Sequence, residues 1–242
     1  YADLSSNFDS NAAEYEYITK TIDSKFKYII GPLMILLGIL ATSTLMIAFT
    51  QYFNKIFKDV SYNLILTILI IVTSIKNIIG VKFTTNTNMV IAITESSTLV
   101  VLIALSFLNY KKWKPNKNTN NINIDQIIHG GFLTIFTYAG FEAIAKLSNE
   151  TKNSKKVLPK AIVYSLLISI ILYTLVSFSV NKIYGTNNVL NSISALSDTF
   201  RILLGKNAQN IVNVIGLLSI FNTVMLTQLF TSRQLYGISD DL

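Results

Sequence analysis

The chain has 242 residues, of which 51% are hydrophobic and only 14% charged, and because soluble domains carry about 25% charged residues, this composition indicates a membrane protein. The formal net charge is +7, but the lysines lie in loops between apolar segments, where anionic lipid headgroups explain them more simply than nucleic acid does. The lack of cysteine excludes disulfide and thiol chemistry, and the single histidine, His129, leaves no zinc cluster.

Residues 1–27 are polar and mixed in charge, and they predict a loop with a short amphipathic helix. Six apolar segments follow, each close to the 20 or so residues that a helix needs to cross a bilayer. These segments cover residues 28–53, 61–80, 88–108, 127–148, 160–182 and 208–230. Residues 187–205 keep apolar side chains at helical spacing, which predicts a short helix over the surface. The predicted fold class is therefore an all-α, polytopic membrane bundle.

The third apolar segment contains a carboxylate, Glu95, among apolar residues. A charged side chain in a span is costly, so such a residue usually has a partner or a function. A structural role, with the carboxylate bonded to neighbouring Ser or Thr hydroxyls, and a role in ion coupling are equally compatible with the residues.

The fourth apolar segment departs from the pattern of a simple span. It carries Gly140 near its middle, and Glu142 follows two residues later in apolar sequence. Glycine costs a helix about 1 kcal/mol relative to alanine, and an ionised carboxylate at the bilayer centre costs at least a few kcal/mol. A broken helix that lines a substrate cavity explains both residues. A glycine packing notch with a paired glutamate explains them equally well.

A family resemblance favours the broken helix. The stretch FTYAGFEAIAKLSNETKNSKKVLPKAI, residues 136–162, resembles the sixth span and following loop of amino acid permeases of the amino acid–polyamine–organocation family. The residues that match the family pattern are Phe136, Tyr138, Gly140, Glu142, Glu150, Lys152, Asn153, Pro159, Ala161 and Ile162. Ser154 stands where the family usually has proline, which implies a looser turn. The length and order of the match make a transporter the favoured interpretation.

Other segments resemble the same family. The first 27 residues are similar to the linker after the second span, with matches at Tyr1, Leu4, Glu14, Tyr15 and Tyr17. The ends of the fourth and eighth spans are matched by Asn77, Gly80, Val81 and Lys82, and by Asn222, Arg233, Tyr236 and Asp240. The resemblance implies a partial LeuT-like fold of 5+5 inverted repeats, with this chain covering approximately the third to eighth spans. The first residue is tyrosine, and we expect the chain to be a fragment.

The resemblance also implies a function and a site. We expect secondary transport of amino acids by alternating access, with protons or sodium as candidate coupling ions. The expected substrate-binding residues are Phe136, Tyr138, Ala139, Gly140, Phe141 and Asn222. Glu142 and Glu95 are the expected proton-coupling residues. No cofactor, metal or nucleic acid is implied, and the expected location is the plasma membrane, in contact with the lipid bilayer.

Other functions remain as alternatives. A polyamine or other organic-cation transporter of the same superfamily is the main one. A channel is less favoured, because the chain has no filter sequence or repeated charged rings. An enzyme is not expected, since intramembrane catalysis needs a cluster of reactive side chains at membrane depth, and this chain has only one histidine and scattered carboxylates.

Overall fold

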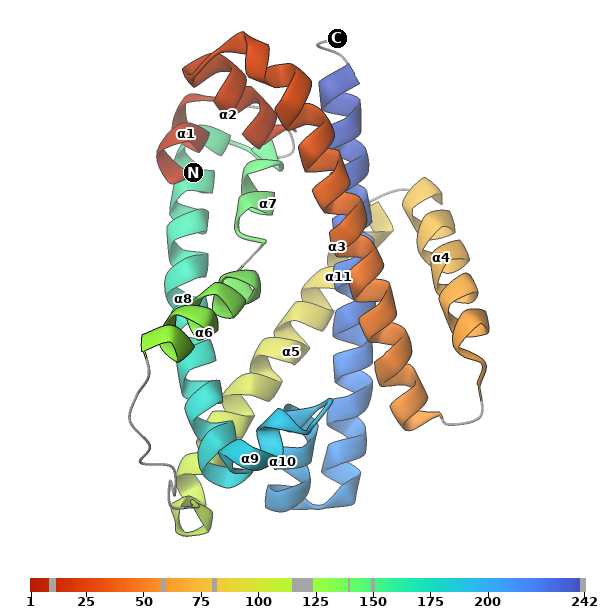
Figure 1. Ribbon diagram of the computed structural model, residues 1–242, viewed down its shortest axis with the longest axis vertical. Helices are drawn as coiled ribbons and strands as arrows, with labels where there is room; N and C mark the ends of the chain where they lie inside the picture. The colour runs from red at the N-terminus through yellow and green to blue at the C-terminus, as the bar shows by residue number, and fades with distance from the viewer. Residues whose placement is uncertain are drawn as a thin grey trace. The chain divides into compact units, whose positions relative to one another are not determined.

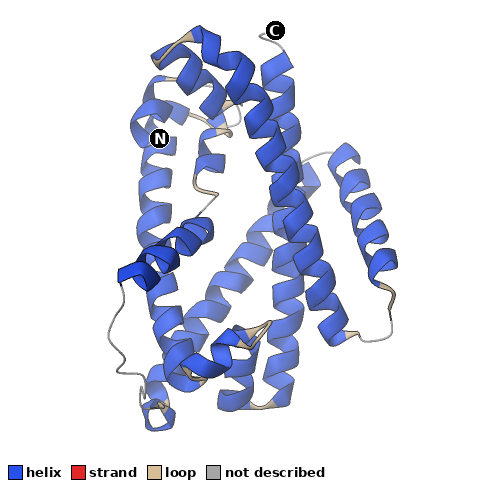
Figure 2. Ribbon diagram, viewed as in Figure 1, coloured by secondary structure: helices blue, strands red, loops and turns tan. Residues whose placement is uncertain are grey.

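The structure is a computed structural model of the chain. It describes residues 1–8, 12–57, 60–79, 82–114, 124–138, 140–148 and 151–239. The described residues form helices and no strands, as expected for an all-α membrane protein (Figure 2). The predicted matches at Gly80, Val81, Glu150 and Asp240 lie outside the described residues.

Thirteen helical elements are described, two of them short 3₁₀ turns (Figure 1). The first seven are α1 (Ala2–Asn7), α2 (Ala13–Thr21), η1 (Ser24–Phe26), α3 (Lys27–Ile56), α4 (Tyr62–Ile79), α5 (Lys82–Leu108) and η2 (Tyr110–Lys112). The last six are α6 (Ile124–Tyr138), α7 (Glu142–Ala145), α8 (Ser154–Ile183), α9 (Thr186–Leu190), α10 (Ala195–Leu204) and α11 (Lys206–Ser239).

Four of the described helices are long and apolar enough to cross a membrane, and a shorter apolar helix covers Tyr62–Ile78. The four are Ser24–Ile56, Asn88–Leu108, Ser154–Ile183 and Lys206–Ser239. The fourth predicted span, residues 127–148, is divided between α6 and α7. Many large apolar side chains of these helices are exposed, including Leu36, Ile71 and Ile171. Such exposure is unfavourable in water, and it suits contact with lipid tails.

The chain divides into two compact units, and several long helices contribute residues to both. Unit 1 comprises Tyr1–Ile39, Asn118–Ile171 and Leu229–Leu242. In it, α1 and α2 lie beside α7 and the start of α8 (Figure 1). The buried side chains at this contact are Ala13, Tyr17, Ala145 and Ile162. The predicted linker is therefore two packed helices and a 3₁₀ turn, because its apolar residues bury against α7 and α8.

Close contact between α3 and α11 in unit 1 depends on a glycine. A Cβ atom added at Gly38 would lie 2.3 Å from the Thr231 Oγ1 atom and 3.0 Å from the Thr231 Cβ atom. Small residues let helices in membranes approach closely. The resulting van der Waals contact stabilises the helix pair, because lipid provides no hydrophobic driving force for helix association. Gly38 is therefore a packing glycine.

Unit 2 comprises Leu40–Lys117 and Leu172–Gln228. One buried cluster joins α5, α8, α10 and α11 through Leu102, Val180, Ile183, Phe200, Leu203 and Val212. A second cluster joins α3, α4 and α11 through Met46, Leu69 and Val224. The predicted single helix at residues 187–205 is two helices, because α9 ends at Leu190 and α10 begins at Ala195.

Candidate functional site

The candidate site of unit 1 is an interruption in helical backbone between α6 and α7. Helix α6 ends at Tyr138 and α7 begins at Glu142. Between them Gly140 has a φ of +120°, a backbone conformation that side chains with a Cβ rarely adopt. Apart from the two adjacent residues, no described residue has an atom within 4 Å of a Cβ added at Gly140. Gly140 therefore permits the break through its backbone angle, and no described helix packs into it as into a notch.

Part of the backbone freed by the break is satisfied within the chain. The Gly140 N–H donates a hydrogen bond of 2.7 Å to Glu142 Oε2. The Gly140 carbonyl accepts from the Ala143 N–H at 3.1 Å, and the Phe141 carbonyl accepts from the Ile144 N–H at 3.2 Å. Glu142 is half-buried. The Glu142 carboxylate thus accepts a hydrogen bond from the Gly140 N–H, which the interruption would otherwise leave unpaired.

The other predicted substrate residues of this segment lie close together in sequence. Tyr138 is the last residue of α6, and its side chain is half-buried, as is that of Phe141. Phe136 lies in α6, but its side chain is outside the described part of the chain, and Ala139 is outside it altogether. The break therefore lies within residues 138–142, the short segment that contains Tyr138, Gly140, Phe141 and Glu142.

The remaining predicted residues belong to unit 2. Asn222 lies in α11 and is only 9% exposed, and its Oδ1 atom has no hydrogen-bond partner among the described residues. Glu95 lies in α5 and is exposed. Neither residue belongs to the unit that contains the helix break.

The N-terminal region contacts the first residue of the segment that follows the break. The Tyr1 ring meets the Phe141 ring edge-on, with centroids 5.3 Å apart. Partial burial and the negative charges of Glu14 and Glu142 raise the pKa of the Tyr1 hydroxyl above its ordinary range. The Tyr1 side chain therefore lies near two carboxylates, one on α2 and one on α7.

A buried ion pair connects the N-terminal helices to the end of the same segment. The Lys146 Nζ atom lies 3.1 Å from Glu14 Oε1, and the two side chains are only 10% and 5% exposed. Lys146 also donates a hydrogen bond of 3.4 Å to Gln234 Oε1 of α11. Burial raises the pKa of Glu14, and the charge of Lys146 offsets this effect in part. In the sequence, Glu14 stands out only as a match to the family's linker pattern, and nothing around Lys146 indicates its role.

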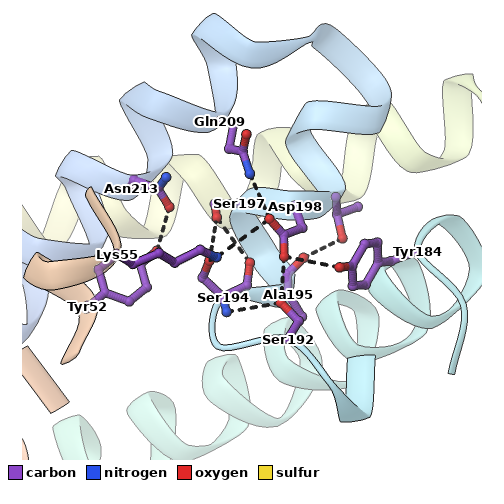
Figure 3. A network of polar contacts seen from close by, with 11 residues as sticks. Tyr52, Lys55, Tyr184, Ser192, Ser194, Ala195, Ser197, Asp198, Gln209 and Asn213 are labelled. Carbon is purple, nitrogen blue, oxygen red and sulfur yellow. Dashed lines mark hydrogen bonds and ion pairs between the residues drawn. The ribbon is translucent and has the colours of Figure 1, made fainter. Parts of the chain in front are cut away.

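Unit 2 contains a second polar network, centred on Asp198 in the first turn of α10 (Figure 3). Its Oδ2 atom accepts hydrogen bonds from the Ser192 hydroxyl at 2.6 Å and from the Tyr184 hydroxyl at 3.2 Å. Its Oδ1 atom accepts one from Gln209 Nε2 at 2.7 Å. The Lys55 Nζ atom lies 3.7 Å from the same Oδ1. Asp198 therefore connects α3, the end of α8, the α9–α10 turn and α11.

The network lowers the pKa of Asp198. Burial alone would raise it, but the hydrogen bonds and the positive charge of Lys55 favour the carboxylate more strongly, so the pKa lies below its ordinary value. Lys55 also donates to the Ser194 hydroxyl. One turn earlier in α3, the Tyr52 hydroxyl donates to Asn213 Oδ1 at 3.0 Å. No motif in the sequence had identified this network.

Comparison with known proteins identifies the family. The model of the family described as "Amino acid permease" matches residues 1–241. The branched-chain amino acid permease BcaP of Bacillus subtilis is 24% identical over 199 residues, which cover 73% of this chain and 42% of that protein. The methylthioribose transporter of the same organism is 23% identical over 265 aligned positions, covering all of this chain and 56% of that protein.

A plant relative is named for a further class of solute, cationic amino acids. The chloroplastic cationic amino acid transporter 9 of Arabidopsis thaliana is 26% identical over 187 residues, covering 75% of this chain and 32% of that protein. The chain spans about half the length of the first two relatives. The match over residues 1–241, together with the apolar helices, confirms the predicted family and the predicted all-α membrane fold class. The chain belongs to the amino acid permease family of integral membrane transport proteins.

Proposed function

We propose that the chain forms part of a secondary transporter that moves amino acids across a membrane by alternating access, with the substrate at the break around residues 136–141. The observation that carries the proposal is the interruption at Gly140, with its φ of +120° and no described atom where a Cβ would lie. In lipid, unpaired backbone groups are tolerated only where they line a cavity or are buried in protein. A polar ligand at the break would satisfy such groups.

The end of α6 supplies acceptors for the ammonium group of an amino acid. The last four carbonyl groups of a helix lack partners within it, and the helix dipole places partial negative charge there. Helix α6 ends at Tyr138, directly before the break. The aromatic residues Tyr138 and Phe141, with Phe136 two residues before Tyr138, then supply apolar surface for a substrate side chain. Asn222, which belongs to unit 2, stays a separate prediction from the family resemblance.

Glu142 couples substrate binding to protons in this proposal. Its carboxylate accepts the Gly140 N–H, which is a donor that a substrate carboxylate would also use. A neutral carboxyl is a weaker acceptor than a carboxylate. Protonation of Glu142 therefore releases the Gly140 N–H for the substrate, and one proton accompanies one substrate. Glu95, exposed on α5, is retained as the second proposed coupling residue.

A polyamine or other organic cation is the alternative substrate class. The observation that favours it is the half-buried Glu142 carboxylate beside the break, because a carboxylate is the natural counter-ion of a substrate ammonium or guanidinium. One relative is named as a cationic amino acid transporter. Under this alternative, Glu142 binds the cationic group directly and does not compete with a substrate carboxylate.

The deciding experiment is uptake by the full-length protein in proteoliposomes. The labelled solutes are leucine, arginine and putrescine, with pH and sodium varied independently. Leucine uptake that rises with an inward proton gradient supports the leading proposal. Uptake of putrescine with no uptake of leucine or arginine supports the alternative. Lack of uptake of these three solutes and of a mixture of the twenty labelled amino acids contradicts both. The proposed location is the plasma membrane, which fractionation of the source cells would test.

A further inference from the structure

The N-terminal helices of unit 1 hold the segment after the helix break at both ends. At its beginning, the Tyr1 ring contacts the Phe141 ring. At its end, Glu14 pairs with Lys146, which follows the last residue of α7. Between these contacts, Ala13 of α2 is buried in one cluster with Ala145 of α7. Helix α7 has only four residues, so its position depends on these contacts more than on its own hydrogen bonds.

The charged pair Glu14–Lys146 lies beside small apolar residues. The neighbouring buried residues Ala12, Ala13 and Ala145 are small and apolar. Replacing a buried ion pair by well-packed apolar residues is often neutral or stabilising, whereas breaking the pair by removing one partner is strongly destabilising. A buried pair thus adds little net stability, and it makes partly separated arrangements unfavourable. Such a contact favours two states, one with the pair formed and one with both charges in water.

The arrangement in which Glu14 and Lys146 are paired also leaves polar atoms without partners. The Ser148 hydroxyl and the Gln234 Nε2 atom are buried and have no hydrogen-bond partner among the described residues. Each such group costs about 1–3 kcal/mol compared with its hydrated form. Separation of Glu14 from Lys146 would admit water to these groups, and this gain offsets part of the cost of opening.

The backbone on either side of this segment has unusual angles. Gly140 has a φ of +120°, and Asn153, which precedes α8, has a φ of +55°. Element ends with such angles are common places for a hinge, where a change in a few backbone angles moves a whole segment. Helix α7 can therefore move while α6 and α8 stay helical.

From these four observations we infer that the Glu14–Lys146 pair is a clasp that fixes the segment after the break and must separate once in each transport cycle. The inference rests on the proposed transport function and adds a pair of positioning residues to it. When the clasp is closed, α2 holds residues 141–146 in place within unit 1. When it is open, the segment moves and the substrate can leave on the side where α1 and α2 lie. Glu14 and Lys146 act through this segment and do not touch the substrate.

A reversible cross-link tests whether the clasp opens. Ala13→Cys and Ala145→Cys are introduced together into a cysteine-free full-length protein and joined by oxidation, which leaves Glu14 and Lys146 intact. The readout is uptake of a mixture of the twenty ¹⁴C-labelled amino acids by proteoliposomes. We expect the cross-link to reduce uptake at least tenfold, and dithiothreitol to restore it. The two single-cysteine variants, oxidised in the same way, are the matched controls. Undiminished uptake by the cross-linked protein would overturn the inference.

A second measurement does not depend on transport. Ile162→Cys places a thiol in the cluster beneath α2, at a position that is 2% exposed, and its rate of modification by N-ethylmaleimide reports opening. Glu14→Gln leaves Lys146 as an uncompensated charge, and we expect the rate to rise at least tenfold. Glu14→Gln with Lys146→Met removes both charges, and we expect a rate within about threefold of the parent. Equal rates in all three proteins contradict the clasp, whether or not amino acids are transported. Lack of uptake by the reduced protein contradicts the proposed function alone.

Discussion

The Glu142 carboxylate accepts a hydrogen bond from the Gly140 N–H, two residues earlier in the chain, at 2.7 Å. This bond closes the turn between α6 and α7, and it uses a donor that the break itself creates. The residue that permits the break and the residue that stabilises it are therefore only two positions apart in the sequence. Substitutions of the two should have different effects.

Gly140→Ala should weaken substrate binding without preventing folding. A Cβ has room at this position, but a φ of +120° is strained for alanine, at a cost of about 1–3 kcal/mol. The chain can relieve that strain by changing the shape of the break. We expect normal abundance in the membrane and an affinity for the transported amino acid that is at least tenfold lower, measured by scintillation proximity binding.

Gly131→Ala is the matched control for this substitution. An added Cβ at Gly131 also meets no described atom within 4 Å, and Gly131 does not have a positive φ. Alanine should favour α6 at this position by up to about 1 kcal/mol. We expect unchanged affinity. Equal affinities of both variants and the parent protein would place the substrate away from the break.

Glu142→Gln should remove the proton dependence of transport. Glutamine keeps a carbonyl oxygen that can accept the Gly140 N–H, but it has no charge that protonation could remove. We expect binding to persist and the pH profile of uptake between pH 5 and 8 to become flat. The measurement is initial uptake rate in proteoliposomes at fixed membrane potential. A pH profile identical to that of the parent protein would exclude Glu142 as the coupling residue and leave Glu95 as the proposed one.

Asp198→Asn should destabilise unit 2 in a pH-dependent way. The pKa of Asp198 in the folded protein lies below its ordinary value, which is about 3.9 in an unfolded chain. Its stabilising contribution is therefore fully present above about pH 4, and it is lost as the pH falls through the lower, folded pKa. At pH 7 the variant loses hydrogen bonds to a charged group, which are worth about 1.5–3 kcal/mol each.

Thermal unfolding of the detergent-solubilised protein from pH 3 to pH 7 tests this prediction. We expect the midpoint of Asp198→Asn to lie below that of the parent protein at pH 7, and the two midpoints to converge at acid pH. Asp3→Asn, at an exposed position in α1, is the control and should follow the parent protein throughout. A constant difference between Asp198→Asn and the parent protein over the whole range would contradict a contribution from the Asp198 charge.

The six predicted spans give a topology that cysteine labelling can test. Single cysteines at Thr19, Lys114 and Ser154 are separated by three predicted spans and then by one. We therefore expect a membrane-impermeant maleimide to label position 114 from the side opposite to positions 19 and 154. Labelling of all three positions from the same side would show that the number of spans is wrong.

Sequence reasoning succeeded where one residue dictates a local conformation. The glycine at position 140 predicted a possible break, and the break occurs there because only glycine adopts its φ easily. The helical character of the apolar segments was likewise predictable, since each long apolar run must satisfy its own backbone hydrogen bonds in lipid. The choice between a broken helix and a packing notch required the family resemblance.

The polar contacts were not predictable, because their partners are far apart in sequence. Lys146 and Gln234 are separated by 88 positions, and nothing in the residues around either one indicates the other. Glu14 lies in a polar segment that, considered alone, is typical of a solvated linker. Its burial depends on α7 and α8, which follow more than a hundred residues later. Tertiary contacts therefore decide which of the many charged residues are buried.

The network around Asp198 has a consequence for biosynthesis. Lys55 and its hydrogen-bond partner Ser194 are 139 positions apart, and Tyr52 and Asn213 are 161 apart. At translation rates of about 5–20 residues per second, Lys55 is added to the chain roughly 7 to 28 s before Ser194. During that interval the end of α3 lacks the partners that α10 and α11 supply in the finished protein. Unit 2 can therefore reach its final arrangement only after the ribosome has completed α10 and the first part of α11, however early α3 enters the bilayer.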